Sequence, residues 1–183
     1  LHLHASHTSP NSASGSDGWA PSELRFLPLA AWEQRARLLP LYLSEGRFPT
    51  QYRTVNTTCI PKKGHLSTPI DHRLLSIFSA LYRVEACAWF HMLQPWLATA
   101  THPDLCGGIA GREPVEAAWD AQSDLEHSLL YGLDTAMISY DYYKFFDTFN
   151  PQFTRQLITH VGFPPALADA WLNLQINSTH SQT

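Results

Sequence analysis

The stretch Ile138-Ser139-Tyr140-Asp141-Tyr142-Tyr143-Lys144-Phe145-Phe146-Asp147 carries the pattern that decides the predicted fold of this chain. It overlaps an apolar-leaning run, Ala136 to Tyr140, which leads directly to Asp141. The best strand candidate is Ala136 to Tyr142, with Asp141 near its end. A carboxylate at the end of a buried strand suits a divalent cation such as Mg²⁺, because hard cations take oxygen ligands. Taken alone, the pattern favours an aspartate that caps a turn.

Around this run the sequence predicts an α+β protein, with helices packed on one side of a short sheet. The first twenty residues, rich in His, Ser, Asn and Gly, are expected to form a flexible terminal segment. The other predicted elements are a helical stretch from Pro21 broken near Pro28, a strand from Arg53 to Pro61 with a turn at Lys63-Gly64, an apolar helical face from Ile77 to Trp96 with the helix ending near Gln94, a glycine-rich loop from Asp104 to Arg112, and helices opening at Pro114, Pro151 and Pro165, the second stopping at Gly162.

Composition indicates a globular domain. The chain has 183 residues, of which 44% are hydrophobic and 12% aromatic. No apolar run approaches the roughly 20 residues of a membrane span, so no membrane association is expected. Three cysteines without paired spacing favour reduced thiols and an intracellular location, with nucleus and cytoplasm both open. The sequence contains no phosphate-binding loop, nucleophile elbow or established zinc spacing.

The charge is unevenly distributed, although the net value is only −4. Between Arg47 and Arg83 basic residues face one acid, Asp71, whereas acids dominate from Asp104 to Asp147. A basic segment followed by an acidic, metal-holding segment is what a nucleic-acid polymerase needs. Ordinary scatter of surface charge is the alternative.

Several further blocks, in this order along the chain, resemble the reverse transcriptases of non-LTR retrotransposons. The segment from Asp141 to Asp147 is similar to the first palm motif of that family. The other similar blocks are Ser14-Gly15-Ser16-Asp17-Gly18, Gly46-Arg47-Phe48-Pro49, Ile60-Pro61-Lys62-Lys63-Gly64, His72 to Val84, Cys106 to Arg112, Asp147-Thr148-Phe149-Asn150 and Leu157 to Pro165.

This resemblance implies an incomplete right-hand polymerase fold. Residues 1–20 would be a flexible terminal segment, 21–134 a fingers-like region and 135–183 the first part of the palm. The chain begins with Leu1 and reaches Thr183 before any Y-x-D-D-type block, so we expect a truncated palm within a longer polyprotein. The family reaction is extension of a DNA primer on an RNA template from dNTPs, by two-metal nucleotidyl transfer with Mg²⁺, or Mn²⁺ as an alternative ion. The isolated chain is expected to be inactive, because it lacks the second carboxylate motif.

The resemblance also assigns roles to individual residues. Asp141 would be the catalytic metal ligand, helped by the carbonyl of Tyr142, and Phe146 would exclude a 2′-hydroxyl from the dNTP site. In the fingers, the residues that would bind the triphosphate of the dNTP are Lys62, Lys63 and Arg73. In the glycine-rich loop, the residues that would contact the template are Gly108, Gly111 and Arg112.

Each assignment has a plainer alternative. Phe146 could be a core aromatic, the lysines solvated charges, and the glycine-rich segment a tight turn between helices. Leu74, Ile109, Glu113 and Pro114 depart from the family pattern, which affects nucleotide and template contacts more than the fold.

Two alternative functions stay open. One is a non-catalytic remnant of a retroelement that at most binds nucleic acid. The other is an RNA-dependent RNA polymerase, against which Phe146 argues because such enzymes must admit the ribose hydroxyl.

Overall fold

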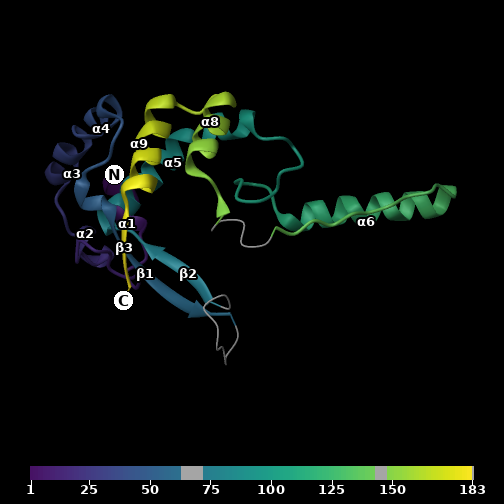
Figure 1. Cartoon of the computed structure of the whole chain (residues 1–183), viewed down its shortest axis with the longest axis horizontal. Helices are drawn as coiled ribbons and strands as arrows, with labels where there is room; N and C mark the ends of the chain where they lie inside the picture. Colours follow the sequence, from purple (N-terminus) through teal and green to yellow (C-terminus); the bar gives the residue numbers. More distant parts are fainter. Residues whose placement is uncertain (63–71, 143–147, 183) are drawn as a thin grey trace. The chain divides into compact units, whose positions relative to one another are not determined.

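The computed structural model describes residues 1–62, 72–142 and 148–182, and it combines helices with one short sheet (Figure 1). The chain is therefore α+β, while its assignment to a polymerase fold remains a prediction. Contacts divide it into two compact units: Leu1–Met92 with Pro151–Thr183, and Leu93–Asn150. Each unit is described separately below.

The first unit opens with helices α1 (His2–His7), α2 (Pro21–Leu24), α3 (Leu29–Ala36) and α4 (Leu39–Glu45). The predicted break near Pro28 is confirmed, since Pro28 is the N-cap of α3. The prediction of a terminal loop is wrong for residues 2–7. Ala5 is fully buried in a cluster with Leu24, Trp32, Ala80 and Val84, and this packing depends on distant residues that terminal composition does not reveal.

The sheet has the strand order β2-β1-β3, with β1 (Thr54–Pro61), β2 (His72–Ile77) and β3 (Thr179–Gln182). A 3-10 turn, η1 (Thr50–Arg53), precedes β1, and the predicted strand from Arg53 to Pro61 is confirmed apart from its first residue. β2 pairs antiparallel with β1, whereas β3 pairs parallel with it. Val55 and Thr57 point into the core in the alternation expected of a strand. The turn predicted at Lys63-Gly64 lies outside the described residues.

Helix α5 (Ala80–Ala100) differs from its prediction at both ends. Ile77 ends β2, so the helix starts three residues later than its apolar face suggested. The helix also continues through Pro95, which removes one backbone donor, and helical bonding is still present beyond it, where the Thr101 N–H donates to Leu97 O. The expected stop at Gln94 is therefore wrong.

The second unit contains α6 (Pro114–Tyr131), which begins at the predicted proline and ends at Gly132 in the left-handed conformation (φ 62°). The strand predicted over residues 136–142 is wrong, because these residues form no strand. Met137, Ile138 and Tyr140 are 57–79% exposed, and none of the described strands pairs with the segment. A strand pattern forms a strand only where a neighbour completes the ladder.

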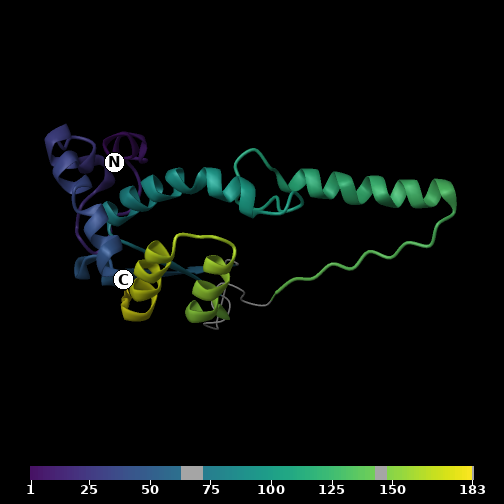
Figure 2. The ribbon, with the colours of Figure 1, turned by 90° about the horizontal axis from the view of Figure 1, so that it is seen from above.

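Helices α8 (Pro151–His160) and α9 (Pro165–Asn177) begin at their predicted prolines, and Gly162 lies just beyond α8 with φ 88°. α9 contacts both α8 and α4, and Figure 2 shows α8 and α9 side by side. Leu167, Ala168, Ala170 and Leu174 bury one side of α9. Within the described ranges, no helix combines the length and apolar character needed to cross a membrane.

Candidate functional site

The β1–β2 hairpin brings together two cations that are separated in the sequence. Its antiparallel register pairs Ile60 with Arg73 and Pro61 with His72, and Lys62 follows directly after β1. Lys62 and Arg73 therefore belong to the same end of the hairpin, and both are exposed. Arg73 is paired with Ile60, two residues before Lys62, so the two cations are diagonal neighbours and not directly opposite each other. Diagonal neighbours of this kind lie about 7–8 Å apart, within reach of long side chains.

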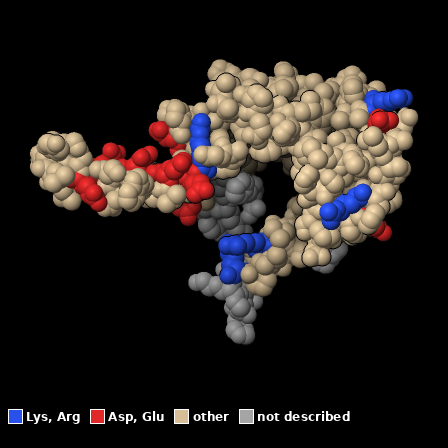
Figure 3. Space-filling view, turned by 180° about the vertical axis from the view of Figure 1, so that it is seen from behind, with Lys and Arg blue, Asp and Glu red and all other residues tan. Residues whose placement is uncertain are grey.

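Figure 3 shows Lys and Arg atoms gathered at this end of the hairpin. The strands β1 and β2 themselves contain no Asp or Glu. Arginine binds phosphate oxygens through a planar fork and lysine does so as a point charge, so the pair suits a phosphate group. Lys63, the third predicted cation, lies outside the described residues.

Other arginines of the basic segment form hydrogen bonds and ion pairs within the protein that stabilise the fold. Arg53 donates from Nη2 to Asn173 Oδ1 at 3.2 Å, which joins the start of β1 to α9. Arg83 donates to the carbonyl of Ala13, and Arg47 pairs with Glu45 at 2.8 Å. The hairpin pair differs from these because Lys62 and Arg73 sit where β1 ends and β2 begins.

Asp141 belongs to the second unit, in the segment that follows α6. Its side chain is exposed, as is that of Tyr142, which is 72% exposed. Among the described residues no group of three or more His, Cys, Asp or Glu could hold a metal ion. The role of Asp141 as a Mg²⁺ ligand, expected to act together with carboxylates from another motif, therefore stays a prediction. Phe146 lies outside the described ranges, so its role as a sugar gate stays a prediction.

The glycine-rich loop contains Gly108 and Gly111 at φ 73° and 79°, a conformation that other residues rarely adopt. A Cβ atom at either position would meet nothing within 4 Å, so backbone conformation explains these glycines better than close packing. Arg112 donates from Nη1 to the carbonyls of His102 (2.6 Å) and Leu105 (3.1 Å). Arg112 therefore stabilises its own loop, and its predicted template contact remains untested.

Two of the sequence blocks pack against each other at the start of α5. Gly15 lies so close to the backbone that an added Cβ would come within 2.5 Å of Ser79 Cα. The Asp17 carboxylate accepts hydrogen bonds from the N–H groups of Ala80 and Leu81, while Ser79 Oγ accepts one from Tyr82 N–H. The first three N–H groups of the helix are thereby satisfied. Gly15 and Asp17 have a structural role that the sequence resemblance alone did not define.

Sequence reasoning missed a buried polar network that joins α3 to α5. Arg35 donates from Nε to Glu85 Oε1 at 2.5 Å and from Nη2 to the Tyr52 hydroxyl. Glu85 is 1% exposed, and its Oε2 atom has no partner among the described residues. A glutamate in the apolar stretch after Val84 signals the need for a cation, because a buried charge must be paired. The sequence does not show which cation supplies it.

The surroundings shift the pKa values of this network. Burial raises the pKa of Glu85, and the Arg35 guanidinium only partly opposes that shift. Burial acts to lower the pKa of Arg35, but the Glu85 carboxylate together with Tyr52 and Tyr42 outweighs it, and the net change is upward. Burial also raises the pKa of Tyr52. Arg35 therefore stays charged, and Glu85 takes up a proton more readily than an exposed glutamate.

Comparison with known proteins gives a distant relative. The chain is 26% identical over 155 residues to the "Transposon TX1 uncharacterized 149 kDa protein" of Xenopus laevis. The matched region covers 85% of this chain but only 12% of the relative. No family model matches the chain. The sequence is thus distantly similar to a transposon protein, a result compatible with an origin in a retroelement.

Proposed function

We propose that this chain is the fingers and first palm portion of a reverse transcriptase of the non-LTR retrotransposon type. The observation that carries the proposal is the hairpin register, which brings Lys62 and Arg73 to one strand end where they suit a triphosphate. The similarity to a transposon protein over most of the chain supports the same conclusion. The hydrogen bond from Ala80 N–H to Asp17, which joins two of the sequence blocks that resemble this family, supports it further.

In this proposal the hairpin cations orient the triphosphate of a dNTP, and the parent protein supplies an RNA template and a DNA primer. Mg²⁺, or Mn²⁺ in its place, would neutralise charge on the reacting phosphate when bound. Asp141 is the residue of this chain that we assign to hold it, although the described residues do not by themselves make a two-metal site.

The hairpin is tested by binding of a fluorescent dATP analogue to the chain. Replacing both Lys62 and Arg73 with Gln should weaken binding about three- to tenfold, because two charge-assisted contacts are lost. The control is a double variant with Gln at Arg25 and Arg37, two exposed arginines outside the hairpin. It removes the same charge and should bind nearly as the natural chain does. Equal losses of affinity in both double variants would mean that the net charge of the chain, and not the hairpin, explains the effect.

Asp141 and Phe146 are tested in a longer protein that contains the rest of the polymerase. Asp141→Ala should abolish primer extension, and retained extension would remove Asp141 from the mechanism. Phe146→Val should raise incorporation of rNTPs relative to dNTPs. Unchanged sugar selectivity would indicate that Phe146 is a packing residue and not a sugar gate.

One observation favours a second candidate, a non-catalytic retroelement remnant that at most binds nucleic acid. The segment carrying Asp141 forms no strand, and the carboxylate is exposed. A longer protein that binds dNTPs through the hairpin but shows no primer extension with either Mg²⁺ or Mn²⁺ would support the remnant.

A further inference from the structure

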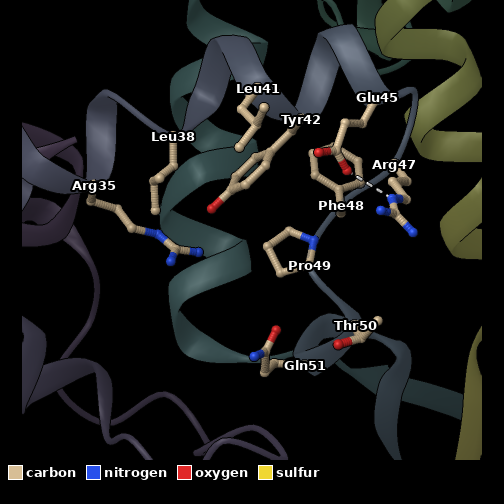
Figure 4. A pocket seen from close by; sticks show the side chains of 10 residues that line it. All are labelled: Arg35, Leu38, Leu41, Tyr42, Glu45, Arg47, Phe48, Pro49, Thr50 and Gln51. Atoms are coloured by element: carbon tan, nitrogen blue, oxygen red, sulfur yellow. Dashed lines mark hydrogen bonds and ion pairs between the residues drawn. The ribbon is translucent and has the colours of Figure 1, made fainter.

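A cavity of about 390 Å³ lies in the first unit, between the α3–α4 region and the chain leading to β1 (Figure 4). Its apolar walls come from Leu38, Leu41, Tyr42, Phe48 and Pro49. This volume is in the range of small-molecule pockets, which combine mostly apolar walls with a few polar groups. The cavity does not include Lys62 or Arg73, so it is separate from the proposed triphosphate site.

The cavity contains a polar group that the fold leaves unused. Tyr42 is 7% exposed, and its hydroxyl is buried without a hydrogen-bond partner among the described residues. Figure 4 shows this hydroxyl directed toward the side of the pocket where Arg35 and Leu38 lie. An unpaired buried hydroxyl is unfavourable, and a bound molecule that accepts its hydrogen bond removes that penalty.

Arg35 supplies a second donor group near the same hydroxyl. Its guanidinium carbon is 5.7 Å from the centre of the Tyr42 ring. Arg35 uses Nε for Glu85 and Nη2 for Tyr52, and no hydrogen bond from Nη1 is seen among the described residues. A guanidinium can only donate, and the Tyr42 hydroxyl can also donate, so both groups suit an acceptor atom.

The charges in the walls are already compensated within the protein. Arg35 is paired with Glu85, and Arg47 is paired with Glu45 at 2.8 Å on the opposite side of the pocket (Figure 4). An anion would gain little net attraction here, and a cation would approach the Arg35 guanidinium unfavourably. The lining therefore suits an uncharged molecule.

We propose that this cavity binds a small uncharged compound with an apolar body and one carbonyl oxygen. The carbonyl accepts hydrogen bonds from the Tyr42 hydroxyl and the Arg35 guanidinium, while the body packs on Leu38, Leu41 and Pro49. This site is independent of polymerase function, because it uses none of the residues assigned to nucleotide, metal or template.

Benzamide is the probe, titrated into the full chain while the NMR resonances of the cavity residues are followed. We expect saturable shifts in the millimolar range, as for a fragment of this size. Benzylammonium has a similar ring but carries a cationic donor in place of the carbonyl, and it should cause no saturable shift. Absence of saturable binding by benzamide, or equal binding of the two compounds, would overturn the proposal.

Two variants locate the site. Tyr42→Phe keeps the ring and removes an unpartnered hydroxyl, so the chain should fold at least as stably while benzamide binding weakens about fivefold. Leu41→Trp should fill the cavity from an exposed position and abolish binding, whereas Leu29→Trp, also exposed but outside the cavity, should leave it unchanged. Unaltered binding in either Tyr42→Phe or Leu41→Trp would show that benzamide binds elsewhere.

Discussion

The carboxylate of Asp17 accepts a hydrogen bond from the backbone N–H of Ala80 at 3.3 Å, across a sequence separation of 63 residues. Its second oxygen accepts one from Leu81 N–H at 3.4 Å. The negative charge also lies at the N-terminal end of α5, where the helix dipole favours it. An aspartate in a Ser- and Gly-rich segment thus determines how the amino-terminal chain attaches to the longest helix of the fold.

Removing this contact should destabilise the protein measurably. Asp17→Ala is expected to lower the free energy of unfolding by about 1 kcal/mol, as for loss of a helix cap. Asp17→Asn keeps an acceptor oxygen and should lose less. Urea denaturation followed by far-UV circular dichroism measures both values. If Asp17→Ala is as stable as the natural chain, the hydrogen bonds to Ala80 and Leu81 contribute nothing to stability.

Gly15 is expected to tolerate no side chain. An added Cβ would lie 2.5 Å from Ser79 Cα, so Gly15→Ala forces the amino-terminal segment away from α5 and should cost about 1–3 kcal/mol. Gly107→Ala is the matched control, since its Cβ would meet nothing within 4 Å. Thermal or urea unfolding compares them. A Gly15→Ala variant as stable as Gly107→Ala would contradict the close approach.

The buried Glu85 should make stability depend on pH. Its pKa is raised above the ordinary value of 4.5, so the folded state holds the proton more tightly than the unfolded state does. The stabilisation that protonated Glu85 contributes to the folded state is fully present below pH 4.5. It is lost as the pH rises through the folded-state pKa of Glu85. The raised pKa of Arg35 acts only at strongly alkaline pH and does not disturb this window.

This dependence is tested by comparison with Glu85→Gln, which cannot titrate. The stability advantage of the natural chain over the variant should shrink as the pH rises from 4.5 toward neutrality. Urea unfolding at several pH values measures the difference. An advantage that stays constant or grows with pH would mean that the Arg35 pairing outweighs burial and that the pKa of Glu85 is not raised.

Pro95 should weaken the helix that passes through it. Pro95→Ala restores one backbone donor within α5 and should raise stability by about 1–3 kcal/mol, with a small gain in helical circular dichroism. Met92→Ala, at another exposed position of the same helix, serves as the control and should change stability little, because Met and Ala are both good helix formers. No gain from Pro95→Ala would indicate that the helix does not continue beyond Gln94.

Local signals were sufficient for several element starts, because prolines and glycines act on their own backbone. Pro114, Pro151 and Pro165 open helices as predicted, and Gly132 and Gly162 lie just after helix ends. Local patterning failed where a partner was needed. Residues 136–142 show a strand pattern but form no strand, whereas the polar segment Thr179–Gln182 pairs with β1.

For the candidate site too, the sequence and the tertiary structure supply different information. The order of the sequence blocks singled out Lys62, Arg73 and Asp141 as residues of interest. Their types follow from chemistry that the sequence displays, namely cations for phosphate and a carboxylate for metal. Only the antiparallel register placed Lys62 and Arg73 at one strand end.

By itself the sequence determined where the helices opening at Pro114, Pro151 and Pro165 begin and which residues carry the cationic and carboxylate groups of interest, because these properties depend on nearby backbone and side-chain chemistry. The tertiary structure alone decided that Asp17 caps α5, that Arg35 pairs with Glu85, and that the Tyr42 hydroxyl faces a cavity without a partner among the described residues. The physical reason is that a buried polar group takes its stability from atoms far away in the chain, and only the folded backbone brings those atoms within hydrogen-bonding distance.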